Sequence, residues 1–273
     1  MNENDLNWAA CIVYYEDSDS LTNLINQLSS QSLRPNEIFV VDNHSSRVPR
    51  LLNNSIKVNH IKLEENFGFG IAANVGIKKA IENNYSKFIL FSQDVELEND
   101  SCKKLIENLN FNGGITFPTM RNKKNNTIFS KGGIVNIFTG SIKLYTDKVP
   151  KNIYWADGSC LAFNKITFLK LNGFYEKYFM YFEDVDFCLR AKINKFKLTH
   201  VNTYTSQIPN GPNPFFRSRN SILLARHINS DLMKISVTKR NILGVFLLFA
   251  KFRFSEAKQR FQGIIAGWKV AID

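Results

Sequence analysis

The sequence predicts an α/β fold, with a mostly parallel sheet flanked by helices and a helical extension at the C-terminus. Apolar runs typical of buried strands alternate with amphipathic helical segments through residues 8–110. The 273 residues are 44% apolar and 22% charged, a balance that is typical of globular proteins and excludes general disorder. The longest strongly apolar run, residues 242–250, is shorter than the ~20 residues that a membrane-spanning helix needs.

The first 110 residues follow the order βαββαβα. The expected strands cover residues 9–15, 37–43, 57–63 and 87–94. The expected helices cover residues 20–31, 68–82 and 100–109. Helical crossovers join parallel strands, and such sheets bind ligands at the carboxyl ends of their strands. This places Asp42, Asn43 and Asp94 at the expected binding edge.

The regular alternation of strand and helix patterns ends after Phe111. A hairpin is expected within residues 127–146, and a strand interrupted by a turn at 157–158 within residues 153–163. Further helices are expected over residues 183–192, 215–229 and 238–269, the last two after the breaker NGPNP. We therefore expect one α/β domain over residues 1–210, with halves at about 8–110 and 111–210. A basic amphipathic helical tail is expected over residues 211–273.

The net charge of +11 is distributed unevenly. Residues 1–110 carry 10 Lys and Arg against 15 Asp and Glu, whereas residues 111–273 carry 25 against 9. A basic, aromatic-rich tail can meet nucleic acid, an anionic membrane or a phosphate-bearing substrate, or can simply be a solvated face. No nucleic-acid-reading motif is recognisable and the N-terminal half is acidic, so we expect no nucleic-acid partner.

The cysteines and the opening segment indicate the cellular compartment in which we expect the protein. Four Cys, at positions 11, 102, 160 and 188, form no CxxC motif, and the opening MNENDLN has no signal-peptide pattern. We therefore expect a cytoplasmic protein without a structural zinc site or a disulfide scaffold.

An acidic cluster lies among aromatic residues in the segment YFMYFEDVDFC. Acids in the first turn of a helix are favoured by the helix dipole, which accounts for one or two of them. Apolar surroundings raise the pKa of a carboxyl group and make it a usable general base. We therefore expect a role in the site for Glu183 or Asp184.

Two other segments allow more than one interpretation. In EENFGFGIAANVG, Gly68, Gly70 and Ala73 match a dinucleotide-binding fingerprint, but the segment does not follow the first strand and its glycines can simply allow close helix–sheet packing. Asp94, in LFSQDVE, can hold a divalent cation together with substrate phosphates, or can cap a helix or turn.

Six segments together carry a resemblance to a known family. They are IVYYEDSDSLTNLINQLSSQ, IFVVDNHSS, ENFGFGIAANVGI, FILFSQDVEL, DGSCLAFNK and GFYEKYFMYFEDVDFCLRAKINKF. In this order the chain resembles the inverting family-2 glycosyltransferases of GT-A fold, especially bacterial rhamnosyltransferase-like enzymes of surface-polysaccharide assembly. The resemblance implies a nucleotide-binding half, an acceptor half and transfer of a sugar, with Asp184 as the base.

The resemblance also implies roles for individual residues. Donor-binding positions are Tyr14, Tyr15, Glu16, Asp42, Asn66, Gly68, Asn74, Gln93 and Arg219. Acceptor positions are Trp155, Asp157 and Gly158, and the reacting acids are Asp184 and Glu183. Asp94 would hold Mg²⁺ or Mn²⁺ against the diphosphate of a dTDP or UDP sugar. The implied acceptor is a lipid-linked or polysaccharide glycan, which favours a peripheral position on the inner face of the plasma membrane.

Two departures from the family pattern keep an alternative open. Ser92 stands where the family has the first carboxylate of its metal-binding motif, and residues 201–208 contain no His. Arg217 and Arg219 can meet the phosphate charge instead. The alternative is a degenerate subunit that binds a partner enzyme or a glycan. The tail can contact an anionic membrane, pack on the domain or form a homodimer contact.

Overall fold

The computed structural model describes residues 6–49 and 55–272, so residues 1–5 of the polar opening and the final Asp273 lie outside the described residues. The described chain forms two compact units. The first, called here the sheet unit, runs to Gly133 and includes Leu144–Glu176 and Glu183–Pro209. The second, the helical unit, contains Ile134–Lys143, Lys177–Phe182 and the residues from Asn210 onward.

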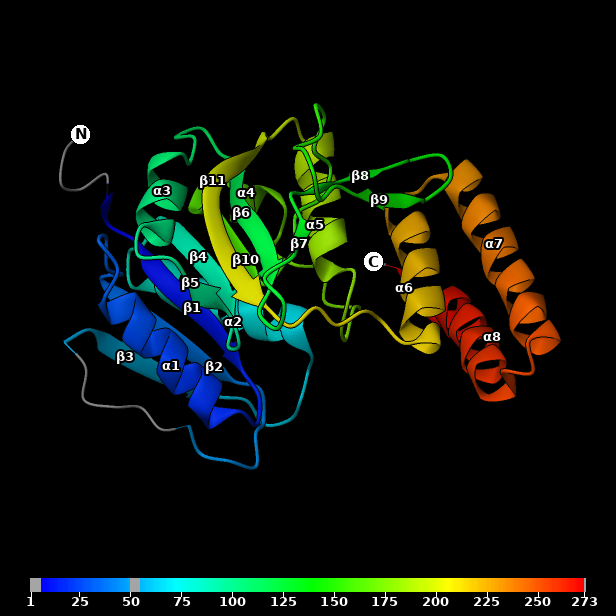
Figure 1. Ribbon diagram of the computed structural model, residues 1–273, viewed down its shortest axis with the longest axis horizontal. Helices are drawn as coiled ribbons and strands as arrows, with labels where there is room; N and C mark the ends of the chain where they lie inside the picture. Colours follow the sequence, from blue (N-terminus) through cyan, green and yellow to red (C-terminus); the bar gives the residue numbers. More distant parts are fainter. Residues whose placement is uncertain (1–5, 50–54, 273) are drawn as a thin grey trace. The chain divides into compact units, whose positions relative to one another are not determined.

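Within the described residues, a nine-stranded sheet forms the sheet unit (Figure 1). Its strands are β1 (Ala9–Tyr14), β2 (Glu37–Asp42), β3 (Lys57–Lys62), β4 (Lys87–Ser92), β5 (Glu96–Leu97), β6 (Ile115–Asn122), β7 (Ile128–Ser130), β10 (Cys160–Asn164) and β11 (Leu198–Gln207). The spatial order is β3-β2-β1-β4-β10-β6-β11-β5, with β7 beside β6. Strands β3, β2, β1 and β4 are parallel, whereas β10 runs antiparallel to both of its neighbours. The parallel half brings the ends of β1, β2 and β4 to one edge.

Helices cover both faces of this sheet. They are α1 (Ser18–Ser29), α2 (Phe69–Glu82), α3 (Ser101–Glu107), α4 (Lys165–Lys170) and α5 (Glu183–Ile193). Side chains of a strand alternate between faces, and β1 shows the consequence. Ala10 and Ile12 join the core beneath α1 and α3, while Cys11 joins the core beneath α2, α4 and α5. Because both faces are buried, the central strands are continuously apolar.

Three helices make up most of the helical unit: α6 (Pro214–His227), α7 (Asp231–Ala250) and α8 (Phe254–Lys269). The α6–α8 contact is close because α8 presents glycines. A Cβ on Gly263 would lie 2.3 Å from the Phe215 carbonyl oxygen, and one on Gly267 would lie 2.7 Å from that of Arg219. The tip of the ribbon formed by β8 (Gly133–Val135) and β9 (Ile142–Leu144) belongs to this unit, where Arg240 donates to the carbonyl of Thr139 at 3.0 Å.

The structure corrects two expectations for the second half of the chain. The single helix expected over 238–269 is wrong: α7 starts earlier, ends at Ala250, and is followed by a turn in which Phe252 has a φ of 56° before α8 begins. Residues 251–253 contain no helix breaker, so helical spacing alone did not reveal the turn. The strand expected over 153–163 is limited to β10, with an isolated bridge between Trp155 and Gly133.

Candidate active site

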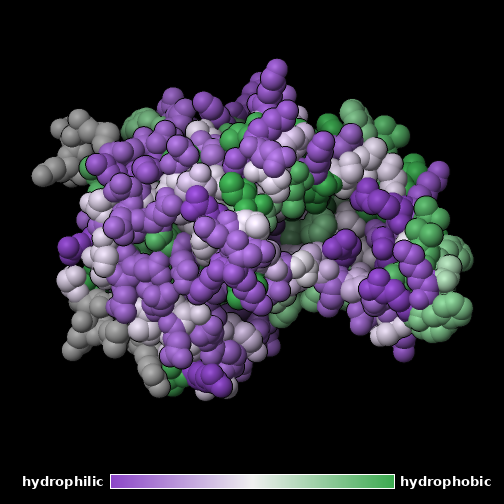
Figure 2. Space-filling model, in the orientation of Figure 1, coloured by the Kyte–Doolittle hydropathy of each residue, from purple (hydrophilic) through white to green (hydrophobic). Residues whose placement is uncertain are grey.

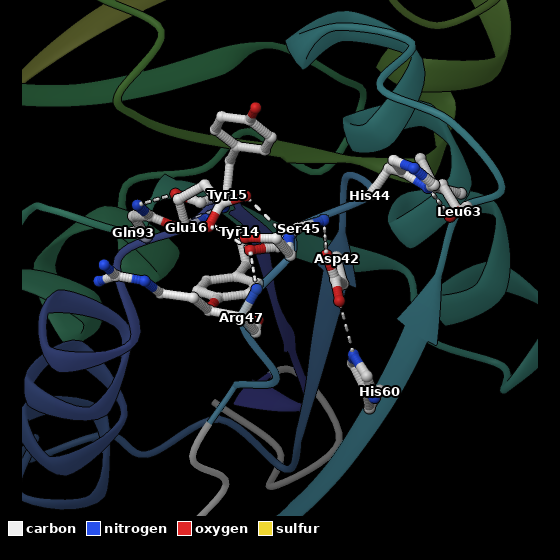
Figure 3. Close-up of polar contacts among 11 residues, drawn as sticks. Tyr14, Tyr15, Glu16, Asp42, His44, Ser45, Arg47, His60, Leu63 and Gln93 are labelled. Atoms are coloured by element: carbon white, nitrogen blue, oxygen red, sulfur yellow. Dashed lines mark hydrogen bonds and ion pairs between the residues drawn. The ribbon is translucent and has the colours of Figure 1, made fainter.

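The ends of β1 and β2 carry buried polar side chains (Figure 3). Asp42 is 1% exposed, and its Oδ1 accepts a hydrogen bond from the Ser45 amide at 2.6 Å. The Nε2 of His60 on β3 lies 3.5 Å from Asp42 Oδ2. Tyr14 is buried, and its hydroxyl donates to the Arg47 carbonyl at 2.8 Å. These contacts order the loop that follows β2, while Asp42 Oδ2 is buried and accepts no hydrogen bond among the described residues.

Tyr15 and Glu16 lie immediately after β1. The side-chain amide of Gln93 accepts from the Tyr15 amide at 2.6 Å and donates to the Tyr15 carbonyl at 2.8 Å. Gln93 therefore ties the end of β1 to the end of β4. The Tyr15 ring is 48% exposed and stands clear of these contacts (Figure 3). An exposed ring held by a fixed backbone is a surface on which a planar base can stack.

Glu16 has a φ of 63° and directs its carboxylate toward the loop after β2. The Glu16 oxygens accept from the amide of Ser46 at 2.8 Å and from the Ser46 hydroxyl at 2.9 Å. These hydrogen bonds to the charged form lower the pKa of Glu16. The carboxylate thus closes the loop against β1.

Side-chain hydrogen bonds order the turn that precedes α2. Asn43 donates to Asn66 Oδ1 at 2.8 Å, and the Gly68 amide donates to the same oxygen at 3.0 Å. The Phe67 amide in turn donates to Asn43 Oδ1 at 3.1 Å. Gly68 has a φ of 89°, a left-handed conformation that favours glycine, and it serves as the N-cap of α2. The residues next to Asn43 in the sequence do not predict these contacts, because its partners Asn66 and Phe67 lie more than 20 positions away.

Asn74 lies inside the fold rather than at its edge. It is 2% exposed, and its amide donates to the Phe174 carbonyl and accepts from the Phe174 amide, both at 2.8 Å. A Cβ on the neighbouring Gly173 would lie 2.5 Å from Asn74 Oδ1. The side chain therefore pins the loop after α4 to α2, and we leave it out of the donor site proposed below.

Asp184 is held at the start of α5. Its Oδ2 accepts hydrogen bonds from Trp155 Nε1 at 2.9 Å and from the Gly158 amide at 3.0 Å. Its Oδ1 accepts from the Val185 amide at 2.7 Å. A Cβ on Gly158 would lie 2.8 Å from the Cβ of Asp184, so this close approach requires glycine. Trp155, Gly158 and Asp184 are thus brought together.

The placement of α5 follows from its packing. Phe187 stacks on Phe174 with ring centroids 4.3 Å apart, and it also contacts Phe163 of β10. Glu183 is 8% exposed, and its Oε2 has no hydrogen-bond partner among the described residues. A Cβ on Gly70 would lie 3.6 Å from that of Glu183, an ordinary packing distance, so the first turn of α2 lies directly beside this acid.

Burial and neighbouring carboxylates raise the pKa values of both acids. Burial raises the pKa of Glu183 to about 8, and the charge of Asp184 adds to the shift. Burial and, secondly, the charge of Asp157 raise the pKa of Asp184 to about 6, against the opposing effect of the hydrogen bond from Trp155. The larger rise falls on Glu183, so Asp184 is the acid of the pair that ionises more readily. A carboxylate with this pKa suits a general base.

Asp94 is tied to a residue that the sequence analysis missed. Its Oδ1 accepts from the Ser92 hydroxyl at 2.6 Å and from Gln207 Nε2 at 2.8 Å. Gln207 Oε1 accepts from the Ser159 hydroxyl at 2.6 Å, and Ser159 also bonds to Asp157. A hydrogen-bonded chain thus joins Asp94 to Asp157. Gln207 lies within residues 201–208, where the family pattern has a His. Its position therefore pointed to a functional residue, but a glutamine there does not match the pattern.

The residues present at Asp94 fit a cation only in part. In the described part of the chain, no group of three or more His, Cys, Asp or Glu side chains is suited to a metal. Mg²⁺ commonly uses one or two carboxylates together with waters and substrate phosphates. Asp94 supplies one carboxylate, of which Oδ1 already accepts two hydrogen bonds, so the fit is to an ion shared with a phosphate-bearing ligand.

Arg219 lies on α6 in the helical unit. Its guanidinium donates to the Lys177 carbonyl at 2.8 Å and to Asn220 Oδ1 at 2.7 Å. Asn220 in turn donates to the carbonyls of Met180 and Tyr181. Both residues therefore hold the segment that precedes α5 against α6. A phosphate-binding role for Arg219 stays a prediction.

A family model described as "Glycosyl transferase family 2" matches residues 9–186, which is more than half of the chain. The chain belongs to glycosyl transferase family 2. The match runs from β1 into the first turn of α5, so it includes the strand ends and the acid pair of this family-2 glycosyltransferase. The predicted family resemblance is confirmed.

Three curated relatives are similar to this family-2 glycosyltransferase. Low-salt glycan biosynthesis hexosyltransferase Agl10 of Haloferax volcanii is 24% identical over 66% of this chain and 60% of the relative. The dTDP-rhamnosyl transferase RfbF of Shigella flexneri is 32% identical over 36% of this chain and 32% of the relative. Rhamnosyltransferase WbbL of Escherichia coli is 36% identical over 22% of each chain. The aligned parts thus span at most 60% of these relatives.

Solved structures support the fold. The mannosyltransferase PcManGT from Pyrobaculum calidifontis, solved with GDP-Man and Mn²⁺, has a TM-score of 0.59 at 10% identity and covers 96% of this chain and 87% of its own. Residues 1–349 of TarS from S. aureus have a TM-score of 0.56 at 17% identity and cover 85% of this chain and 68% of that one. The predicted α/β fold of GT-A type is confirmed.

Proposed function

We propose that this family-2 glycosyltransferase is an inverting enzyme that moves a hexosyl group, rhamnose first among the candidates, from a nucleotide-diphosphate donor to a growing bacterial surface polysaccharide. The observation that carries the proposal is Asp184, a carboxylate that Trp155 and Gly158 hold in a fixed orientation at the start of α5. The names of the curated relatives, two of them rhamnosyltransferases, support the choice of sugar.

The transfer follows from the geometry of Asp184. Its Oδ1, to which the Val185 amide is the one donor among the described residues, takes the proton of the acceptor hydroxyl. The hydroxyl oxygen forms a bond to the anomeric carbon as the bond to the diphosphate oxygen breaks, and the diphosphate leaves with the bonding electrons. Attack from the opposite face inverts the anomeric configuration. General-base help of this kind contributes about 10²–10⁴-fold to the rate.

Glu183 supports this role by staying protonated. A second charge beside Asp184 would raise the pKa of the base and trap its proton, whereas a neutral Glu183 leaves the base near the working pH. Trp155, Asp157 and Gly158, which lie around Asp184, are the proposed acceptor contacts.

The proposed donor site lies at the ends of β1, β2 and β4. The exposed ring of Tyr15 would stack on the base, and Asp42, with the loop closed by Glu16, would contact its edge. Asn66 and Gly68 would line the nucleoside, and Gln93 would hold Tyr15 in place. dTDP and UDP are the proposed nucleotides. The dTDP in the name of RfbF and the UDP complex of TarS support them by analogy.

We further propose that Asp94 holds Mg²⁺ or Mn²⁺ jointly with the donor diphosphate. When bound, such an ion neutralises the charge of the leaving diphosphate. The Mn²⁺ bound to PcManGT supports the proposal by analogy. Arg217 and Arg219 are the alternative source of positive charge. We propose that the enzyme acts at the cytoplasmic face of the plasma membrane on a lipid-linked acceptor. A homodimer is also proposed, and analytical ultracentrifugation tests it.

Ser92 and the tethered Asp94 favour one other function, a degenerate subunit that binds a partner enzyme or a glycan. A thermal-shift panel of UDP, dTDP, GDP and CDP, each with and without Mg²⁺ or Mn²⁺, separates the two. Stabilisation by dTDP or UDP followed by sugar transfer, with the product anomer assigned by NMR, supports the enzyme. If no nucleotide shifts the melting temperature, the degenerate subunit is the better account.

A further inference from the structure

Helix α7 is apolar on two faces, and only one of them is covered. Met233, Val237 and Val245 are buried within the helical unit. Leu243, Phe246 and Leu247 are exposed, with Phe246 at 66%. Residues 241–250 contain no charged side chain. The part of α7 after Arg240 is therefore apolar on both its buried and its exposed face, and an exposed apolar face of this kind marks a surface that binds protein or lipid.

Three exposed phenylalanines form a cluster at the α7–α8 turn. Phe249, Phe252 and Phe254 are 49%, 80% and 54% exposed. The Phe254 ring lies 5.6 Å from that of Phe249 and 6.1 Å from that of Phe252, measured between centroids. We call these three residues the aromatic tip. Phe261, Ile265 and Trp268 continue the exposed apolar surface along α8 at helical spacing.

Positive charge surrounds this apolar surface. Residues 210–272 carry eleven Lys and Arg but only two Asp and Glu. Lys251 lies within the turn and Lys258 follows one turn into α8, both exposed, while Arg253 pairs with Glu256. Figure 2 shows apolar side chains gathered over α7 and α8 with hydrophilic ones interspersed. Exposed aromatics among lysines are the composition of surfaces that enter a membrane interface.

We propose that the α7–α8 hairpin inserts its aromatic tip into the headgroup region of an anionic bilayer, with Lys251 and Lys258 at the lipid phosphates. The charge selects this occupant, because a second copy would bring an equally basic surface against it, whereas anionic lipid attracts it. Among the described helices, none is both long and apolar enough to cross a bilayer. The inference deepens the membrane position proposed above, but its test does not depend on sugar transfer.

Vesicle flotation of the full chain tests the proposal. We expect flotation with vesicles of equal parts phosphatidylcholine and phosphatidylglycerol, and much less with phosphatidylcholine alone. The triple variant F249S/F252S/F254S should lose most of the bound fraction, whereas F111S, which removes an 81% exposed phenylalanine from the sheet unit, should not. Circular dichroism and the nucleotide-induced thermal shift check that the triple variant is folded.

Charge-reversal and tryptophan variants test the contribution of charge and the depth of insertion separately. Lys251→Glu and Lys258→Glu should each weaken binding about fivefold or more, since one basic residue near an anionic surface is worth ~1 kcal/mol, while Lys103→Glu in the sheet unit should have no effect. Relative to the wild type, whose Trp268 lies on the same surface, Phe252→Trp should add blue-shifted emission that brominated lipid quenches, and Phe111→Trp should add none.

Clear outcomes would overturn the inference. One is failure to float on either vesicle by a folded protein. Another is a dimer in analytical ultracentrifugation that the triple variant dissolves, which would assign the surface to a second copy. A separate assay distinguishes failure of this inference from failure of the proposed enzymatic function. If the triple variant loses membrane binding but still transfers sugar to a water-soluble acceptor, the enzymatic function is intact.

Discussion

Gln207 donates a hydrogen bond of 2.8 Å to the carboxylate of Asp94 from 113 positions further along the chain. It holds the carboxylate from the end of β11 while Ser92 holds it from β4, and its other end meets Ser159. In this chain an amide therefore fixes the orientation of a carboxylate that would share a cation with the donor. Gln207 is a positioning residue in this proposal, since it acts through Asp94.

Removing the Gln207 amide should weaken metal-dependent donor binding. A hydrogen bond to a charged group is worth about 1.5–3 kcal/mol, so Gln207→Ala should weaken metal-dependent nucleotide binding about 10- to 100-fold in calorimetry. Binding of the nucleotide without metal should change little. The matched control is Gln262→Ala, at an exposed position on α8. Equal losses with and without metal would instead indicate a general disturbance of the sheet edge.

Asp184→Asn should remove the general base while leaving the donor-binding site intact. We expect kcat to fall about 10²–10⁴-fold, because the amide cannot take the acceptor proton. The thermal shift produced by dTDP or UDP should persist, and Asp100→Asn, at an exposed position before α3, should behave as the wild type. Loss of nucleotide binding together with transfer would contradict this assignment of the base.

The pH profile should report the acid pair. Transfer should decline as the pH falls through about 6, because Asp184 becomes protonated. It should also decline as the pH rises through about 8, because an ionised Glu183 raises the pKa of Asp184 and holds the proton on the base. A profile of kcat/KM for the donor-saturated enzyme measures both limits. Glu183→Gln should remove the upper limit but keep the lower one, and Glu107→Gln, at an exposed position on α3, should keep both.

Glu183 should also make stability depend on pH. Its pKa in the folded protein is raised, from 4.5 to about 8, so its contribution to stability is full below about 4.5 and is lost as the pH rises through about 8. Relative to wild type, Glu183→Gln should gain stability progressively across that window. Chemical denaturation at several pH values measures the difference, and a constant offset would argue against a buried protonated acid.

Gly158→Ala tests the close approach to Asp184. The new Cβ would lie 2.8 Å from that of Asp184, so the carboxylate must shift. A displacement of about 1 Å in a reacting group can lower the rate ~10²-fold, and we expect a loss of that order in kcat. Gly211→Ala, where the nearest atom would be 4.0 Å away, is the control. Unchanged kcat would show that the loop can move without consequence.

Asn74→Ala distinguishes a structural role from donor binding. It would leave the buried amide and carbonyl of Phe174 without their partners, which costs about 1–3 kcal/mol each in free energy of unfolding. The KM for the donor should hardly change. Urea denaturation measures the loss, with Asn152→Ala at an exposed site as control. A raised donor KM without loss of stability would restore Asn74 to the donor site.

The sequence by itself determined the frame of the fold. A continuous apolar run along β1 predicts a strand that is buried on both faces, and the 3.6-residue spacing along α1 predicts the buried face of that helix. The alternation of strands and helices predicts parallel strands whose ends meet at one edge. That reasoning located Asp42 and Asp94, and aromatic neighbours marked the acid pair at 183–184. These are local properties, and local residue patterns are sufficient to predict them.

Only the tertiary structure decided which side chains meet. Asn74 matches the family pattern, yet its amide serves the loop after α4, and Gln207 was missed because its partner lies far away in the sequence. The turn at Phe252 interrupts a segment whose spacing is helical throughout. The physical reason is common to all three. Periodicity reports which face of an element is apolar, whereas hydrogen-bond partners and helix ends depend on atoms that folding brings from distant parts of the chain.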